Sequence, residues 1–233
     1  MAKGIIQNKD SFLNNIADKL ERKRKEDVSL PTWKHQPQWQ VYKNESTDGL
    51  MAAFQKNSTE RNVDVYETQQ SELSVTIEKI INEYGGDSIV ITKDSRFSEY
   101  GLTSLFDTTQ THIWDTAAGK ENIEKAKHAD IGVFFSDKSL AESGTIVQFN
   151  DKDIARSVSL LPITYIAIVP KSTIVPRMTQ VTHEIHKLVE NGKEIPTCVN
   201  FISGPSNSAD IEMDIVVGVH GPVKAVYVVV ADR

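Results

Sequence analysis

The chain has 233 residues, of which 39% are hydrophobic and 25% are charged, and its formal net charge is −6. This composition is typical of a soluble globular protein with a full core, and the negative charge argues against a general nucleic-acid-binding surface. The single cysteine, Cys198, excludes an intrachain disulfide and favours a reducing compartment. Because no apolar stretch has the length of a membrane span or the form of a signal peptide, we expect a cytoplasmic protein.

Residues 1–46 are predicted to form an N-terminal helix followed by an extended arm. Phe12, Leu13, Ile16 and Leu20 recur at helical spacing, which predicts an amphipathic helix over about 9–26. The segment that follows has no periodicity and contains two prolines and two tryptophans between 31 and 39. Its aromatic rings are expected to pack either on the chain's own domain or on a partner subunit.

Residues 47–233 are predicted to form one α/β domain, because apolar strands alternate with amphipathic helices. Such alternation indicates a mostly parallel, mixed sheet with helices on both faces. The two β-like runs within 136–149 leave no room for a helix between them, so we expect one antiparallel excursion there. Strands are expected at 63–66, 88–92, 112–114, 130–135, 161–170 and 225–230, and helices at 50–54, 73–84, 96–106, 121–128 and 175–190.

Two turns carry a high density of polar side chains. The bend Glu142-Ser-Gly-Thr145 is either an ordinary glycine turn or part of a site. The stretch from Ser203 to Glu212 is interpreted as a strand end, a Gly-Pro turn and the start of a short helix. It is either a well-capped turn or a ligand crevice, and both turns are expected to line one pocket at the carboxyl ends of strands.

Several common chemistries lack their sequence signatures. The chain contains no phosphate loop, no dinucleotide-binding glycine motif and no nucleophile elbow. His183, Glu184 and His186 lack the spacing that places two histidines on one zinc, so no metal is assigned. One cysteine cannot supply the thiolates of an ordinary iron–sulfur cluster, so we expect no cofactor in this chain.

The ordered set of polar and apolar blocks resembles the bacterial lactate-utilisation (LUD) family. The blocks are Ala141-Glu-Ser-Gly-Thr-Ile146, Leu161-Pro-Ile-Thr-Tyr-Ile-Ala-Ile-Val-Pro170, Ser203-Gly-Pro-Ser-Asn-Ser-Ala-Asp-Ile-Glu212 and Gly218-Val-His-Gly-Pro222. The resemblance implies a NagB/RpiA/CoA-transferase-like fold and a role in oxidising L-lactate to pyruvate together with iron–sulfur partner proteins. It also exposes two departures: the family often has a basic residue at Asn207 and a histidine at Tyr165. A ligand that depends on those side chains is not expected here.

Two classes of function follow, with a regulatory binding module as a third. The first is a subunit without clusters in a lactate-oxidising complex, and a homo-oligomer is also compatible with the arm. The second is an autonomous small-molecule enzyme with Glu142 as acid, base or nucleophile, acting on an anionic carboxylate or phosphate. The candidate ligand-binding residues are Gly144, Thr145, Arg156, Ser203, Gly204, Ser206, Asn207, Asp210, Glu212 and His220.

Overall fold

The computed structural model describes residues 6–25, 28–29, 31–211 and 214–233, with only the backbone described at 209–211. The chain divides into two compact units, Met1–Pro37 and Gln38–Arg233. The first unit contains helix α1 (Lys9–Lys19), shorter than predicted, and Arg24 pairs with Asp10 across it at 2.8 Å. The contact of this helix with another chain stays a prediction.

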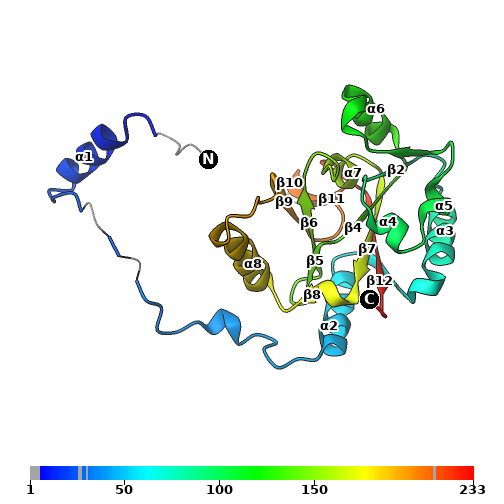
Figure 1. Cartoon of the computed structure of the whole chain (residues 1–233), viewed down its shortest axis with the longest axis horizontal. Coiled ribbons are helices and arrows are strands. Elements are labelled where there is room, and N and C mark those ends of the chain that lie inside the picture. The colour runs from blue at the N-terminus through cyan, green and yellow to red at the C-terminus, as the bar shows by residue number, and fades with distance from the viewer. Residues whose placement is uncertain (1–5, 26–27, 30, 212–213) are drawn as a thin grey trace. The chain divides into compact units, whose positions relative to one another are not determined.

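The second unit is built on a six-stranded parallel sheet in the order β1-β12-β7-β4-β2-β3, and Figure 1 shows it flanked by helices. The predicted fold class, a mostly parallel mixed sheet with helices on both faces, is therefore confirmed. The strands of this sheet are β1 (Val63–Thr68), β2 (Ile89–Ile91), β3 (Thr111–Ile113), β4 (Ile131–Phe135), β7 (Thr164–Pro170) and β12 (Lys224–Val230).

A smaller four-stranded sheet in the order β8-β5-β6-β9 packs on one face of the large sheet. Its strands β5 and β6 form the predicted antiparallel excursion. A separate hairpin joins β10 and β11. These strands are β5 (Lys138–Leu140), β6 (Thr145–Asn150), β8 (Ile174–Val175), β9 (Cys198–Ile202), β10 (Asn207–Ile211) and β11 (Asp214–Val217).

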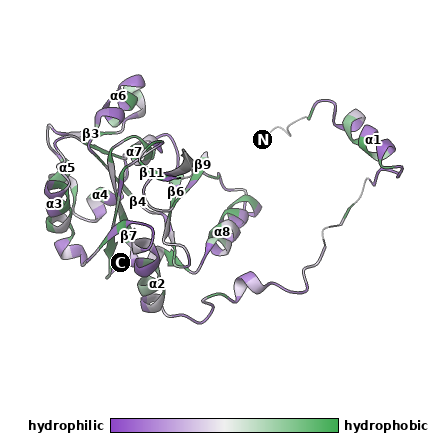
Figure 2. Cartoon of the chain, turned by 180° about the vertical axis from the view of Figure 1, so that it is seen from behind, coloured by the Kyte–Doolittle hydropathy of each residue, from purple (hydrophilic) through white to green (hydrophobic). Residues whose placement is uncertain are grey.

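Side-chain alternation along the strands separates two cores. Ile166 and Ile168 of β7 face helices α3, α4 and α5, whereas Tyr165, Ala167 and Val169 face α2 and the small sheet. Helix α8 covers the outer face of the small sheet through Val181 and Ile185. Hydrophobic and hydrophilic residues lie side by side along α3 and α8, as their one-sided burial requires (Figure 2).

The helices of this unit are α2 (Thr47–Thr59), α3 (Leu73–Glu83), α4 (Arg96–Glu99), α5 (Thr103–Phe106), α6 (Lys120–His128), α7 (Ser157–Leu160) and α8 (Met178–Glu190), with 3-10 turns η1 (Pro37–Trp39), η2 (Gln70–Glu72), η3 (Thr116–Ala118) and η4 (Lys171–Thr173).

Two predicted helices are wrong. The helix expected over 96–106 is broken into α4 and α5, because Gly101 adopts φ 74° and lets the amide of Leu102 bond back to the carbonyl of Phe97 at 2.7 Å. The helix expected after Ser203 is strand β10, whose Asn207 pairs with Val217 of β11. Trp39, expected to pack on a surface, lies edge-on to the His183 ring of α8 at 5.3 Å.

Candidate functional site

Two of the predicted polar turns meet at one cavity of about 580 Å³. It lies at the end of β5, the start of β6, the end of β9 and the first turn of α8. The polar residues that the following argument uses are Glu142, Ser143, Thr145, Arg177 and Ser203.

The pairing of β6 with β9 brings the two turns together. These strands are antiparallel with Ile146 opposite Ile202, so the residues just beyond this pair, Thr145 and Ser203, are neighbours. Their hydroxyl oxygens are 2.6 Å apart, and the hydroxyl of Ser143 lies 2.7 Å from that of Thr145. Three hydroxyls thus form a continuous chain at the cavity. Glu142 and Ser203 follow the carboxyl ends of β5 and β9, as predicted for the two turns, and both strands belong to the small sheet.

Glu142 is positioned by the alignment of the β5 end with β8. Its amide donates to the carbonyl of Pro176 at 3.0 Å, which places the next residue of that segment, Arg177, beside it. The Nε atom of Arg177 lies 2.9 Å from Oε2 of Glu142, and the two side chains are 28% and 38% exposed. A pair this open adds little to stability and can exchange partners with a ligand.

The bend at Glu142 rests on the last turns of α2. Gly144 has φ 57°, and a Cβ atom there would lie 2.5 Å from the backbone nitrogen of Ser58. Asn57 donates its side-chain amide to the carbonyl of Ala141 at 2.7 Å. The close approach of two backbones therefore requires glycine at 144, which fixes the shape of the site.

Two buried tyrosines hold the turn after β9. Tyr165 donates its hydroxyl to the carbonyl of Gly204 at 3.1 Å. The hydroxyl of Tyr227 accepts from the amide of Gly204 at 3.3 Å and donates to the carbonyl of Ile202 at 3.2 Å. Burial raises the pKa of Tyr165 and raises the pKa of Tyr227 to about 12, so both hydroxyls stay protonated donors. The tyrosine at 165 thus has a structural role here.

The remaining candidates divide into those near this cavity and those elsewhere. Asn207 lines an adjacent cavity of about 390 Å³ together with Arg61, and Ser203 borders both. Ser206 is committed through its backbone, because its amide donates to Pro222 and its carbonyl accepts from Gly218, each at 2.9 Å. With a strand rather than a helix at 207, the predicted helix-start anion site does not exist.

Two further predicted site residues lie outside these two cavities, and two others fall where no side chain is described. His220 is exposed in the turn after β11 and lines neither cavity. Arg156 is exposed at the start of α7, beyond the opposite end of β6 from Thr145. Glu212 lies outside the described residues, and of Asp210 only the backbone is described.

Sequence reasoning missed Arg177, although the residue carries the only cation in the cavity lining that the structure describes. The sequence feature that could have pointed to Arg177 is its position after Pro176 and directly before the strongly amphipathic α8. The amide of Arg177 also donates to the side chain of Gln180 at 3.1 Å, which closes the first turn of the helix. The first turn opens on the cavity at Met178 and Thr179, so its positive end adds to the charge of Arg177.

The arrangement suits a small anionic ligand with a hydroxyl or carbonyl group. Arg177 can pair with a carboxylate, the hydroxyls of Thr145 and Ser203 can donate or accept, and Glu142 can accept a hydrogen bond.

Within the described ranges, no three His, Cys, Asp or Glu side chains cluster as a metal site would require. In the same ranges, no helix combines the length and apolar character needed to cross a membrane.

The fold is that of an α/β protein with a polar cavity beside a small secondary sheet. Residues 51–230 match the LUD domain family, and the chain belongs to this family. The resemblance drawn from the sequence is thereby confirmed.

Relatives match over the whole chain. "Lactate utilization protein C" of Bacillus subtilis (strain 168) is 50% identical over 240 residues, covering 100% of both chains. The protein of that name from Halalkalibacterium halodurans is 47% identical and covers 98% of this chain and 100% of its own. A crystal structure of a DUF162 family protein from Deinococcus radiodurans matches with a TM-score of 0.56 and 17% identity, covering 80% of this chain and 99% of that one, which shows a shared fold.

Proposed function

We propose that this chain is a component of a bacterial lactate-utilisation system that carries no iron–sulfur cluster itself. The observation that carries the proposal is the full-length similarity, at 50% identity, to proteins named Lactate utilization protein C. The single cysteine supports it, since a cluster needs several thiolates and would have to be held by partner subunits. In this proposal the chain acts with iron–sulfur proteins in the oxidation of L-lactate to pyruvate, in the cytoplasm.

The cavity beside Glu142 is the part of the chain that would hold the substrate or product. Both L-lactate and pyruvate carry a carboxylate and a neighbouring oxygen, and both are small enough for a cavity of about 580 Å³. The carboxylate would take the place of Glu142 at the guanidinium of Arg177, whose Nε atom now pairs with Oε2 of Glu142. The second oxygen would lie toward the hydroxyls of Thr145 and Ser203.

Ligand binding would also change the state of Glu142. Its carboxylate now pairs with Arg177 at 2.9 Å, and a competing carboxylate would release it. A released Glu142 can accept a hydrogen bond from the substrate hydroxyl and so discriminate lactate from an acid that lacks the hydroxyl. This role needs no covalent step at Glu142, in contrast to the alternative of an autonomous transferase-like enzyme.

Growth on L-lactate tests the function. A bacterium that lacks this chain should fail to grow with L-lactate as carbon source and should recover with the wild-type chain. Arg177→Gln should fail to restore growth, whereas Arg156→Gln, which removes an exposed arginine outside the cavity, should restore it. Normal growth of the deletion strain on L-lactate would contradict the assignment to lactate utilisation.

Calorimetric titration of the purified chain tests the site separately. L-lactate or pyruvate should bind the wild-type protein, and Arg177→Gln should weaken binding about tenfold or more, as expected for a lost charge-assisted contact. Unchanged binding in Arg177→Gln would overturn the site while leaving the growth result intact. Turnover of lactate by the isolated chain, without partners, would instead favour the autonomous enzyme.

A further inference from the structure

One residue that lines the cavity beside Glu142 comes from a separate part of the chain. The other lining residues belong to β5, β6, β9, the bends beside these strands and the first turns of α8, whereas Gln38 belongs to the short turn η1. This turn begins the segment 38–46, which leads to α2 and which we call the strap. A separate segment that contributes to the lining can cover a site that the rest of the fold leaves open.

An aromatic contact at each end of the strap fixes its position. The ring of Trp39 meets the ring of His183 on α8 edge to face, with the centroids 5.3 Å apart, and Figure 1 shows the chain before α2 passing α8. Tyr42 packs against the buried cluster around α2, and the strap ends at Ser46, whose side chain caps that helix. The strap therefore presents Gln38 from a defined place.

The contact between Trp39 and His183 lies beside the α8 wall of the cavity. His183 directly follows Thr182 and lies one helical turn after Thr179, and both threonines line the cavity. Because residues four apart are neighbours on the surface of a helix, the Trp39 ring sits next to this wall. The residue before Trp39 thus reaches the cavity over the first turns of α8.

Gln38 supplies hydrogen-bonding groups that the rest of the lining has already used. The hydroxyls of Thr145 and Ser203 bond to each other, and the hydroxyl of Thr182 donates back to carbonyls of its own helix. Gln38 is half-buried, and its side-chain amide makes no hydrogen bond to another described residue. An uncharged amide has two N–H donors, which can serve an anion without adding a charge.

We propose that Gln38 is a specificity-determining residue of this cavity and that the strap carries it over the bound ligand. Its amide donates to the carboxylate that Arg177 holds, so a small 2-hydroxy or 2-keto acid is contacted both by the α/β fold and by the strap. Trp39 is a positioning residue, because it acts only through Gln38. The inference rests on the proposed function of the cavity and adds the group that favours a carboxylate over its neutral amide.

Calorimetric titration of the full chain with L-lactate tests Gln38. Gln38→Met keeps the length of the side chain and removes its donors, so the dissociation constant should rise about tenfold. The preference for L-lactate over the neutral L-lactamide should shrink, because a donor contributes more to a charged acceptor than to a neutral one. Gln38→Glu should weaken L-lactate binding further, since its charge repels the carboxylate.

Gln40→Met and Gln40→Glu are the matched controls. Gln40 is the same residue type two positions later in the strap, it is exposed, and it lies outside the lining of this cavity. Both variants should bind L-lactate as the wild type does. Weakening by Gln40→Met equal to that by Gln38→Met would mean that the strap acts without a specific contact from Gln38, and would overturn the assigned role.

A measurement without ligand tests the strap itself. In a chain with Cys198→Ser, the variant Thr179→Cys places a single thiol in the lining of the cavity. Adding Trp39→Ala removes the ring that contacts His183, so the thiol should be alkylated several-fold faster. Trp39→Phe keeps a ring and should restore slow alkylation. Trp33→Ala, which removes an exposed tryptophan outside the strap, should leave the rate unchanged.

The outcomes separate this inference from the proposed function. L-lactate binding that Arg177→Gln weakens and Gln38→Met does not would overturn the role of Gln38 and leave the function of the cavity standing. A wild-type chain that binds neither L-lactate nor pyruvate would overturn both. Equal alkylation rates with Trp39 and with Trp39→Ala would show that the strap does not cover the cavity, whatever the cavity binds.

Discussion

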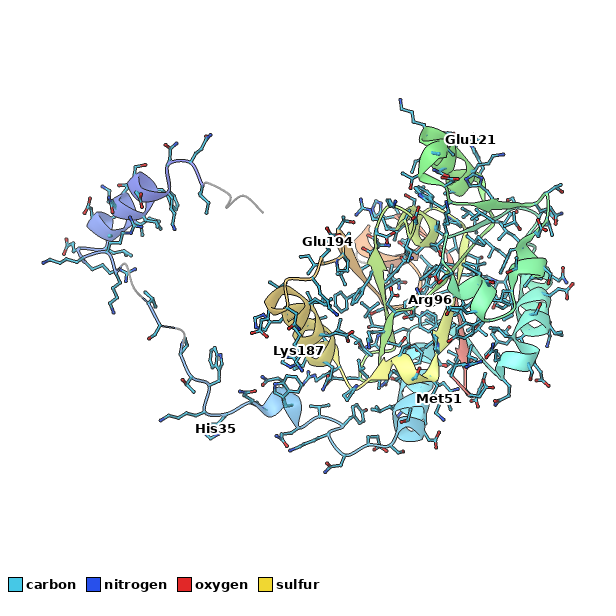
Figure 3. All side chains as sticks on the ribbon, in the orientation of Figure 1. His35, Met51, Arg96, Glu121, Lys187 and Glu194 are labelled. Atoms are coloured by element: carbon cyan, nitrogen blue, oxygen red, sulfur yellow. The ribbon has the colours of Figure 1, made fainter. Side chains whose placement is uncertain are left out.

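Two charged clusters lie at the ends of strands in this molecule, and they differ in the number of their ion-pair partners and in the exposure of their side chains. Arg96, after β2, pairs with Asp94 and Asp137, and the three side chains are only 21%, 5% and 18% exposed. Glu142, after β5, pairs only with Arg177 among the described residues, and both side chains are more exposed. Figure 3 shows Arg96 among the packed side chains of the α/β unit, in contrast to Glu121 and Lys187 at its surface.

The difference separates a structural cluster from an available one. Arg96 also donates to the carbonyl of Ser136 at 3.3 Å and lies over the ring of Phe135, so each of its groups is committed. Burial opposes its charge, but the hydrogen bond to Asp94 and the attraction of Asp137 raise its pKa. The Glu142 pair has no such support and borders a cavity. A charged cluster at a strand end is therefore a binding candidate only where its partners can be exchanged.

The largest expected effect is the loss of the buried arginine. Arg96→Met keeps much of the side-chain volume but leaves Asp94 and Asp137 without their cation, which should lower the free energy of unfolding by about 3–5 kcal/mol. Arg177→Met is the matched control and should change it by no more than about 1 kcal/mol. Urea unfolding of the two variants measures both values. Equal effects would remove the distinction between the clusters.

The second expected effect concerns the backbone that presents Glu142. Gly144→Ala forces a side chain into a left-handed conformation and places its Cβ against the backbone of Ser58. Strain and overpacking together should cost about 3 kcal/mol. Gly192→Ala is the control for strain alone, since it has φ 65° with no atom near the added Cβ, and it should cost about 1–2 kcal/mol. Thermal unfolding compares them, and a Gly144→Ala protein as stable as Gly192→Ala would show that the bend does not rest on α2.

Local periodicity was sufficient for much of the fold. The apolar positions of 73–84 predicted α3, and the continuous apolar runs predicted β4, β7 and β12, because burial of a regular element leaves a regular pattern. The segment at 207 was misread, because Ser206, Asn207 and Ser208 have the local preferences of a helix start. The segment forms a strand because it pairs with β11 and because Gly204 and Gly218 adopt positive φ. The residues around 207 alone do not predict that pairing.

The site was predictable only in part, for the same reason. Glu142, Thr145 and Ser203 could be singled out as polar groups at turns, but their meeting depends on the pairing of β6 with β9. Arg177 reaches Glu142 because β5 runs parallel to β8, a two-residue strand with no pattern of its own. Contacts of this kind belong to tertiary structure, which residue spacing alone does not encode.

The third expected effect concerns the tyrosines behind Ser203. Tyr227→Phe removes the hydroxyl that bridges the amide of Gly204 and the carbonyl of Ile202, and should cost about 1–3 kcal/mol, because both backbone groups lose a buried partner. Tyr165→Phe removes the bond to the carbonyl of Gly204 at 3.1 Å and the longer contact with the hydroxyl of Tyr227 at 3.4 Å, and should cost about 1 kcal/mol. Chemical unfolding gives both values. Tyr165→Phe as the more damaging variant would contradict the assigned hydrogen bonds.

The smallest expected effect is a pH dependence at the buried cluster. Burial raises the pKa of Asp137 above its ordinary value, although Arg96 and the amide of Phe149 favour the charged form. The folded protein therefore binds the Asp137 proton more tightly than the unfolded chain does. The stability that this proton contributes is fully present below the unfolded pKa of about 3.9 and is lost as pH rises through the folded pKa.

Asp137→Asn cannot take up this proton, so it isolates the contribution. The free energy of unfolding of the wild type, relative to the variant, should increase as the pH falls from neutral toward 4. Urea unfolding at several pH values measures the difference. The opposite result would be a difference in free energy of unfolding, wild type minus Asp137→Asn, that decreases as the pH falls. It would mean that the attraction of Arg96 outweighs burial at Asp137, as in an ordinary stabilising ion pair.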